Sequence, residues 1–298
     1  MMSLGKLLRA LVLAPLVCGG CLVQPSQNTP ATNSAAAGND SRTAAAASPT
    51  PEGSPNPESP SGSAEAVEAG SKLETYMRAA SATLMPEQRE ALGRVNTDAR
   101  RLLALRGYLR AGREAASRWA WSRERIESYE KSPEYAAALA EIDKVRREFE
   151  SANPGYTLRV NTQVRSLDEQ LSKWNENDSV TRAGEELLVR AREELAAASY
   201  PDAPAAGEVQ KFERFLRGAT ARVTPTLAVP GLSPHGQSRA FDFQVMRGPQ
   251  LVAAPSSPGG WDSAGWTEKV RAAVTRASTK FAGPLASPRE PWHYDYRP

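Results

Sequence analysis

The stretch SPHGQSRAFDFQVM, residues 233–246, joins a turn that contains Pro and Gly to an alternating apolar run. Such alternation is typical of a strand, and Pro and Gly mark the irregular segment before it. Extended pieces at residues 224–229 and 250–253 flank this stretch, and a helical pattern covers about residues 263–281. The last third of the chain therefore predicts a small mixed or antiparallel sheet with flanking helices, an α+β fold.

Helical patterns fill the region before this sheet. Residues 73–129 are rich in Ala, Arg, Glu and Leu, which are strong helix formers. Ser132 is a candidate N-cap, and Pro133 suits the first turn of a further helix that carries apolar residues at helical spacing. We therefore expect a helical region over residues 72–152 and a separate α+β domain over residues 153–298.

Within the second of these domains, three further elements are expected before the last third of the chain. An alternating segment at residues 156–164 predicts a strand. Helices are expected at residues 182–198 and 209–216.

The first 21 residues carry an export pattern. Lys6 and Arg9 precede a short apolar run, and Gly19 and Gly20 lead to Cys21. The segment resembles a bacterial lipoprotein signal, which implies cleavage before Cys21 and a lipid on that residue. A plain secretory signal is the alternative. Either pattern predicts a periplasmic or cell-envelope protein, and the lipid would anchor it to the membrane.

Residues 22–71 consist mainly of Ala, Ser, Pro, Asn, Thr and Gly. This composition cannot bury enough apolar surface to offset the entropy of ordering, so it predicts a disordered tether.

Charge and cysteine content exclude some classes of protein. The 37 basic and 34 acidic residues give a net charge of only +3, without the excess of Lys and Arg that a nucleic-acid-binding surface needs. Both cysteines, Cys18 and Cys21, lie in the predicted signal, so the mature domain is expected to have no disulfide.

The chain contains two histidines, His235 and His293, and each has a carboxylate residue at a short offset. Asp242 follows the first on the predicted strand, and Glu290 precedes the second by three residues. A catalytic zinc site uses three protein ligands, commonly His and carboxylate, and keeps a fourth position open. A further carboxylate beside bound water can act as a general base. These four residues therefore predict a zinc site with a base.

The two segments resemble the paired motifs of the D-alanyl-D-alanine carboxypeptidase family of zinc peptidases, which includes the vancomycin-resistance carboxypeptidases. The first family motif is S-x-H-x-x-G-x-A-x-D and the second is E-x-x-H, often E-P-W-H. The chain has SPHGQSRAFD at residues 233–242 and EPWH at residues 290–293. The resemblance implies that His235, Asp242 and His293 bind zinc and that Glu290 is the catalytic base.

One position departs from the first motif, because Ser238 stands where the family has glycine. If that glycine serves a positive φ angle, Ser would strain the turn. We expect Gly236, two residues earlier, to absorb the bend.

A third family feature, an Arg-Ser pair after a strand and a Gln on the next helix, is similar to Arg165-Ser166 and Gln170. By this resemblance Arg165 engages the substrate and stabilises the developing oxyanion. Substrate contacts are expected from Arg165, Gln170, Ser233 and Trp292. Trp292 could equally be a wall that excludes water from the metal.

These expectations describe a zinc peptidase that acts on peptidoglycan stem peptides, with a D,D-carboxypeptidase-type activity. The first alternative is an endopeptidase that cuts crosslinks or inner stem bonds, for which the site would be open at both ends. The second is a non-catalytic wall-binding lipoprotein with a structural zinc ion. Glu290 argues against the second alternative, because a structural site fills its fourth position and needs no base.

Overall fold

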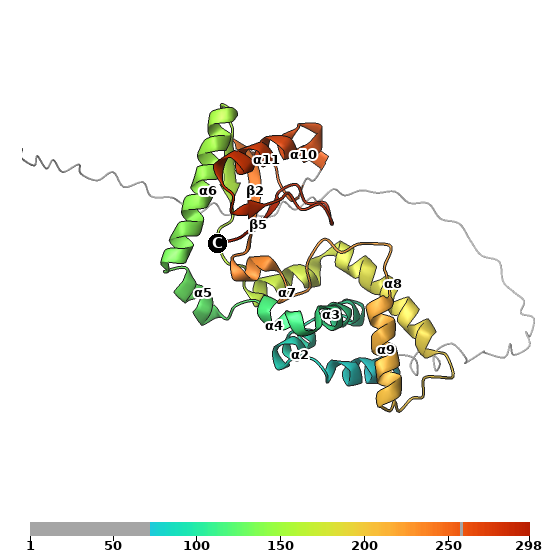
Figure 1. Ribbon diagram of the computed structural model, residues 1–298. Helices are drawn as coiled ribbons and strands as arrows, with labels where there is room; N and C mark the ends of the chain where they lie inside the picture. Colours follow the sequence, from blue (N-terminus) through green and yellow to red (C-terminus); the bar gives the residue numbers. More distant parts are fainter. Residues whose placement is uncertain (1–71, 257–258) are drawn as a thin grey trace, which may run out of the picture. The chain divides into compact units, whose positions relative to one another are not determined.

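The computed structural model describes residues 72–256 and 259–298 (Figure 1). The predicted signal at residues 1–21, Cys21 and the predicted tether at residues 22–71 lie outside the described residues. Among the helices that are described, none combines the length and the apolar character needed to cross a membrane.

The first part of the described chain is helical. Residues 72–81 form a helix. The elements that follow are α2 (Pro86–Gly93), α3 (Asp98–Ala111), the 3-10 helix η1 (Gly112–Glu114), α4 (Ala115–Arg118) and α5 (Arg123–Tyr129). The longest of them, α3, has Thr97 as its N-cap, and the Thr97 side-chain oxygen accepts a hydrogen bond from the Arg100 amide.

Helix α6 (Pro133–Ala152) begins where the sequence predicts. The Ser132 hydroxyl accepts a hydrogen bond from the Tyr135 amide, and Pro133 occupies the first turn, where its missing N–H costs nothing. Strand β1 (Thr157–Val160) follows and is shorter than the predicted segment. The chain then forms three more helices, α7 (Leu167–Glu176), α8 (Asp178–Leu195) and α9 (Ala206–Gly218).

The last third of the chain supplies the rest of the sheet. Its elements are η2 (Pro234–Gln237), β2 (Ala240–Arg247), β3 (Gln250–Ala253), α10 (Gly259–Ser263), α11 (Trp266–Ala277), β4 (Phe281–Ala282) and β5 (His293–Tyr296). Within the described residues the strands form a five-stranded sheet in the order β1-β2-β5-β4, with β3 also on β2. Every pairing is antiparallel. The prediction of an α+β fold with a small sheet is confirmed. The sheet was expected to be mixed or antiparallel, and it is antiparallel.

The strand predicted at residues 224–229 is wrong, because these residues form bends and irregular chain. Pro225 and Pro230 have no N–H to donate to a strand ladder. The apolar side chains of Leu227 and Val229 pack instead against the helical part.

Two hydrophobic clusters form, and they do not follow the order of the chain. The first unites the helices before α5 with α7, α8 and α9. The second unites α6 and α11 with the sheet, so that both helices cover one sheet face (Figure 1). The predicted boundary between residues 152 and 153 falls between α6 and β1, which share the second cluster. That boundary stays a prediction.

Candidate metal centre

Two of the predicted ligands lie side by side on the sheet. In the register of β2 and β5, Asp242 stands directly opposite His293. Their chain neighbours Phe241, Phe243 and Tyr294 point into the hydrophobic cluster under α6 and α11. Because successive side chains of a strand face opposite ways, Asp242 and His293 share the other sheet face.

The third predicted ligand comes from the turn before β2. His235 lies in η2, which begins with Pro234, and the turn is completed by Ser238 at φ 53° and ψ 31°. Ser238 therefore takes the left-handed conformation itself, and the expectation that Gly236 absorbs the bend is wrong. The Tyr129 hydroxyl on α5 donates a hydrogen bond of 3.1 Å to Ser238 Oγ, which helps to hold this turn.

Gly236 instead allows η2 to lie close to Gln170 and Ala120. A Cβ atom there would lie 2.7 Å from Nε2 of Gln170 and 2.8 Å from Cβ of Ala120. Both distances are too short for a side chain, so η2 can sit against α7 and the segment before α5 only with glycine at this position.

Residues 117–121, at the end of α4 and just after it, hold the turn that carries His235. The Ala120 amide donates to the Gly231 carbonyl at 2.7 Å, and the Trp121 amide donates to the Gly236 carbonyl at 3.0 Å. The side-chain amide of Gln237 donates in return to the carbonyls of Ser117 and Trp119. The helical part thus positions a predicted metal ligand, a role that the sequence does not reveal.

The three predicted ligands offer donor atoms at separations that suit one metal ion. Nδ1 of His293 lies 3.2 Å from Nε2 of His235 and 3.2 Å from Oδ1 of Asp242, and the third separation is 3.5 Å. Donors about 2.0–2.1 Å from a tetrahedral ion would stand about 3.3 Å apart. The group is largely buried, with side-chain exposures of 11%, 19% and 8% for His235, Asp242 and His293. These residues could therefore hold a metal ion.

Electrostatics favours the ionised form of Asp242. Burial acts to raise the pKa of this carboxyl, but hydrogen bonds from His235 and His293 and their charges outweigh burial and bring the pKa well below its usual range. Burial lowers the pKa of His235, against the opposing effect of Asp242. For His293 burial also acts to lower the pKa, but the hydrogen bond and charge of Asp242 and the charges of Glu290 and Asp295 raise it overall.

Glu290 lies beside the donor atoms without joining the group of three. Its Oε2 is 3.7 Å from Nδ1 of His293, and its backbone pairs with Leu285. Burial raises the pKa of Glu290, and the charge of Asp242 adds to this, while His293 and Arg165 act against it. A half-buried carboxyl with a raised pKa can accept and return a proton.

Arg165 also reaches the site. Its guanidinium Nη2 lies 3.5 Å from Oδ2 of Asp242, and its backbone N–H donates to the His235 carbonyl at 3.0 Å. The structure therefore brings together the predicted ligands, the predicted base and the predicted cation.

The other predicted substrate contacts have different surroundings. Gln170 is buried, and its side chain donates to the Arg165 carbonyl and accepts from the Gly231 amide. It ties the segment before α7 to the segment before η2. Ser233 is buried at the start of η2. Trp292 is buried in the second cluster, where its ring centroid lies 6.3 Å from that of Trp261.

Asp295 is a further site residue that the motifs do not predict. Its Oδ1 lies 3.3 Å from Nε2 of His293, the ring nitrogen opposite to the one that faces the other donors. The available signal was the strand period of two in HYDY, which places residues 293 and 295 on one face.

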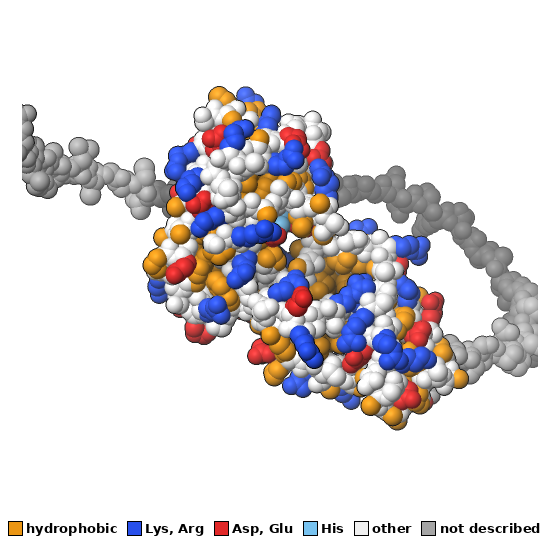
Figure 2. All heavy atoms as spheres, viewed as in Figure 1, with side chains coloured by type: hydrophobic (Ala, Val, Ile, Leu, Met, Phe, Trp, Pro, Cys, Tyr) orange, Lys and Arg blue, Asp and Glu red, His pale blue; other side chains and the backbone are white. Residues whose placement is uncertain are grey.

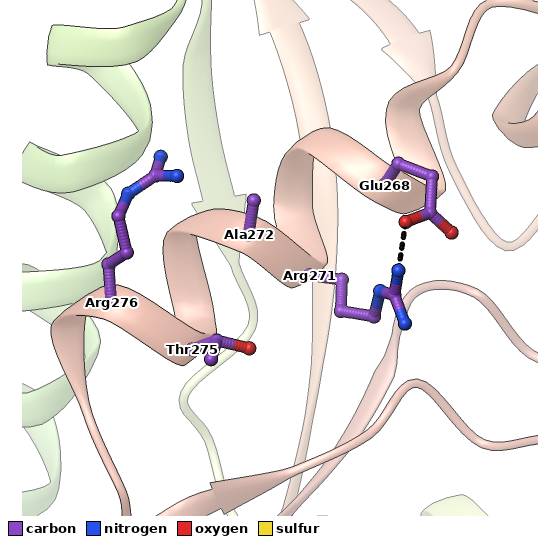
Figure 3. A pocket seen from close by; sticks show the side chains of 5 residues that line it. All are labelled: Glu268, Arg271, Ala272, Thr275 and Arg276. Carbon is purple, nitrogen blue, oxygen red and sulfur yellow. Dashed lines mark hydrogen bonds and ion pairs between the residues drawn. The ribbon is translucent and has the colours of Figure 1, made fainter.

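The candidate site and the pocket on α11 are separate places on the molecule. In Figure 2 a pale blue histidine surface is visible at a hollow, with Lys and Arg side chains beside it. Figure 3 shows a different pocket on α11, where Arg271 pairs with Glu268 and Arg276 extends the rim. All its lining residues belong to α11. That pocket is a charged helix face and holds none of the predicted site residues.

Comparisons with protein-family models, with curated proteins and with solved structures gave no match.

Proposed function

We propose that this protein is a zinc-dependent peptidase that hydrolyses peptidoglycan stem peptides with a D,D-carboxypeptidase-type activity. The observation that carries the proposal is the convergence of His235, Asp242 and His293 beside Glu290. Three ligands and one unliganded carboxylate are what a catalytic zinc site requires.

Donor spacing supports zinc over a metal with octahedral geometry. An octahedral ion at the same bond lengths would hold adjacent donors about 2.9 Å apart, whereas a tetrahedral ion holds them about 3.3 Å apart. The separations of 3.2, 3.2 and 3.5 Å lie nearer the second value. Two imidazoles and one carboxylate also form a ligand set that zinc enzymes use. Metal analysis of the purified protein would test this assignment.

The chemistry divides among the site residues. Bound zinc would supply Lewis acidity to the scissile carbonyl and lower the pKa of bound water. Glu290 accepts the proton of the attacking water and returns it to the leaving amine. Arg165 places a fixed cation beside the site, where it stabilises negative charge that develops on the carbonyl oxygen.

The substrate class rests on the two motifs. SPHGQSRAFD, with Ser238 in place of the family's glycine, and EPWH resemble the motifs of peptidases that act on D-alanine bonds. The predicted export signal agrees with a substrate outside the cytoplasm.

A muropeptide digest tests the activity. Bacterial sacculi are incubated with the chain from residue 72 onward, with and without a chelator, and the products are read by mass spectrometry. Loss of a terminal D-alanine, prevented by the chelator, is the expected result. Cleaved crosslinks or inner stem bonds would indicate the endopeptidase. No product from folded, zinc-loaded protein would contradict the proposal and favour the wall-binding alternative.

The substitution Glu290→Ala tests the division of roles. We expect turnover to fall by about 10²–10⁴-fold, because the proton acceptor is lost, while zinc stays bound through the other three residues. Activity on muropeptides and zinc content are measured together. Glu268→Ala, an exposed carboxylate on α11, is the matched control and should leave both unchanged. Loss of zinc from the Glu290 variant would contradict the assignment of a base.

A further inference from the structure

Three arginine side chains converge where α9 ends. Arg106 and Arg110 on α3 both donate to the Ala219 carbonyl, at 2.8 Å and 3.1 Å. Arg110 also donates to the Arg217 carbonyl at 2.8 Å, and Arg190 on α8 donates to the Thr220 carbonyl. The three guanidinium groups therefore meet around one short segment, although they come from two helices.

No carboxylate neutralises this cluster in the part of the chain that the structure describes. Arg106, Arg110 and Arg190 have no ion-pair partner there. Glu186 on α8 and Glu213 on α9 pair with other arginines, Arg222 and Arg217. Figure 2 shows Lys and Arg side chains gathered over this helical part.

The cluster carries an electrostatic cost. Arg106 is half-buried, and burial lowers its pKa to about 10, with the charges of Arg110 and Arg190 adding to the effect. The three guanidinium groups repel one another. The carbonyls at the end of α9 carry only partial negative charge, so they offset only part of the repulsion between these groups. A full negative charge among the three groups would offset more of it.

The cluster also keeps donors free. A guanidinium group has five N–H donors in a fixed planar fork. The hydrogen bonds to carbonyls use one nitrogen of Arg106, two of Arg110 and one of Arg190. The remaining N–H groups suit an oxyanion that can accept several hydrogen bonds at once.

We propose that Arg106, Arg110 and Arg190 form a binding site for a phosphate group. Phosphate offers up to two negative charges and several acceptor oxygens, which fit forks that approach from α3 and α8 better than a single planar carboxylate does. The metal donors lie on η2, β2 and β5, so this site is separate from the proposed peptidase site. It does not depend on the proposed function.

Phosphate titration of the purified full chain tests the site. Thermal unfolding is followed in inorganic phosphate and in sodium chloride at matched ionic strength, and isothermal titration gives the Kd. We expect phosphate to raise the midpoint of the wild-type chain more than chloride does. In Arg110→Gln/Arg190→Gln this extra shift should vanish and the Kd should weaken by at least about tenfold. Arg182→Gln/Arg192→Gln, two exposed residues of α8, is the matched control and should behave as the wild type.

Vesicles distinguish the source of the phosphate group. Sedimentation with phosphatidylglycerol vesicles, but not with phosphatidylcholine vesicles, and its loss in the cluster variant would indicate a lipid headgroup. Binding of inorganic phosphate without binding to vesicles would indicate a soluble phosphate compound. Either result supports the site.

An equal phosphate shift in the wild type and in the cluster variant, or no shift in either, would overturn the proposal and leave the arginines as caps of α9. If the double variant fails to fold, the single variant Arg110→Gln, at an exposed position, is titrated in its place. An unchanged Kd in that variant counts against the site.

Discussion

Asp295 lies where its carboxylate can prepare His293 to bind the proposed metal ion. Nδ1 of His293 faces Asp242 and His235, while Nε2 faces the Asp295 carboxylate. A carboxylate at Nε2 accepts its N–H and leaves Nδ1 without a proton, which is the form that binds metal. We therefore expect Asp295 to be a positioning residue that selects the tautomer and the ring orientation of His293.

The substitution Asp295→Ala tests this role. We expect zinc affinity to weaken by about 10–100-fold, because the His293 ring loses the partner that fixes its tautomer. Competition with a chromophoric chelator measures the affinity. Asp143→Ala, which removes an exposed carboxylate on α6, is the control and should leave the affinity unchanged. Equal affinity in the Asp295 variant and the wild type would contradict the assignment.

The residues of the candidate site differ in how well the sequence predicts them. His235, Asp242 and His293 were predicted to converge, and the structure confirms that they form one possible metal site. These residues stand in motifs with fixed short spacings, so local sequence was enough to find them. Tyr129 supports the same turn from more than 100 positions away, and nothing in its local sequence marks that contact.

At the scale of elements, a single glycine allows α8 to pack closely against α3. Gly184 lies in α8, and a Cβ atom there would stand 2.6 Å from the carbonyl oxygen of Ala99 in α3. The obstacle is backbone, which cannot turn aside as a flexible side chain can. The packing of α8 on α3 therefore depends on the absence of a side chain at this position.

The substitution Gly184→Ala should lower the free energy of unfolding by about 1–3 kcal/mol, because the added methyl group forces the two helices apart. Gly207→Ala in α9 is the matched control, since a Cβ atom there meets nothing within 4 Å. In an open helical position alanine should raise the free energy of unfolding by about 0.5–1 kcal/mol. Urea denaturation measures both, and effects of the same sign would refute this account.

Elements with local signals were predicted well, and those that depend on distant contacts were not. Helix α6 has its N-cap and first-turn proline in sequence, so its start was found. Residues 224–229 include apolar residues that a strand could bury. Pro225 and the following Pro230 cannot donate to a strand, and Leu227 and Val229 pack against the nearby helices, so the segment lies outside the sheet. The apolar pattern shows that a segment is buried without showing which partner buries it.

For the molecule as a whole, the two clusters depend on interleaved segments. Helix α6 precedes β1 but belongs with the sheet, through buried residues such as Ile142, Val145 and Phe149. Helices α7, α8 and α9 lie between β1 and β2 in sequence but complete the first cluster. The expected domain division could not show this exchange, because periodicity identifies a buried face and not the cluster that buries it.

A fragment of residues 153–298 should therefore fail to fold, because it lacks α6 from the second cluster and α3 from the first. The fragment of residues 72–298 keeps both clusters and is the control. Circular dichroism and the dispersion of amide proton signals compare the two. A cooperative thermal transition in the shorter fragment would contradict this prediction.

The pairing of β1 with β2 has a consequence for the order of folding. Thr157 pairs with Met246, and the chain between them contains the α-helices α7, α8 and α9 and the 3-10 helix η2. Closing so long a connection costs chain entropy, and the cost falls once the intervening helices have packed into a compact unit. We expect the helices to associate early and the strands to find their register late. Metal binding would then report the last step of folding rather than guide the first.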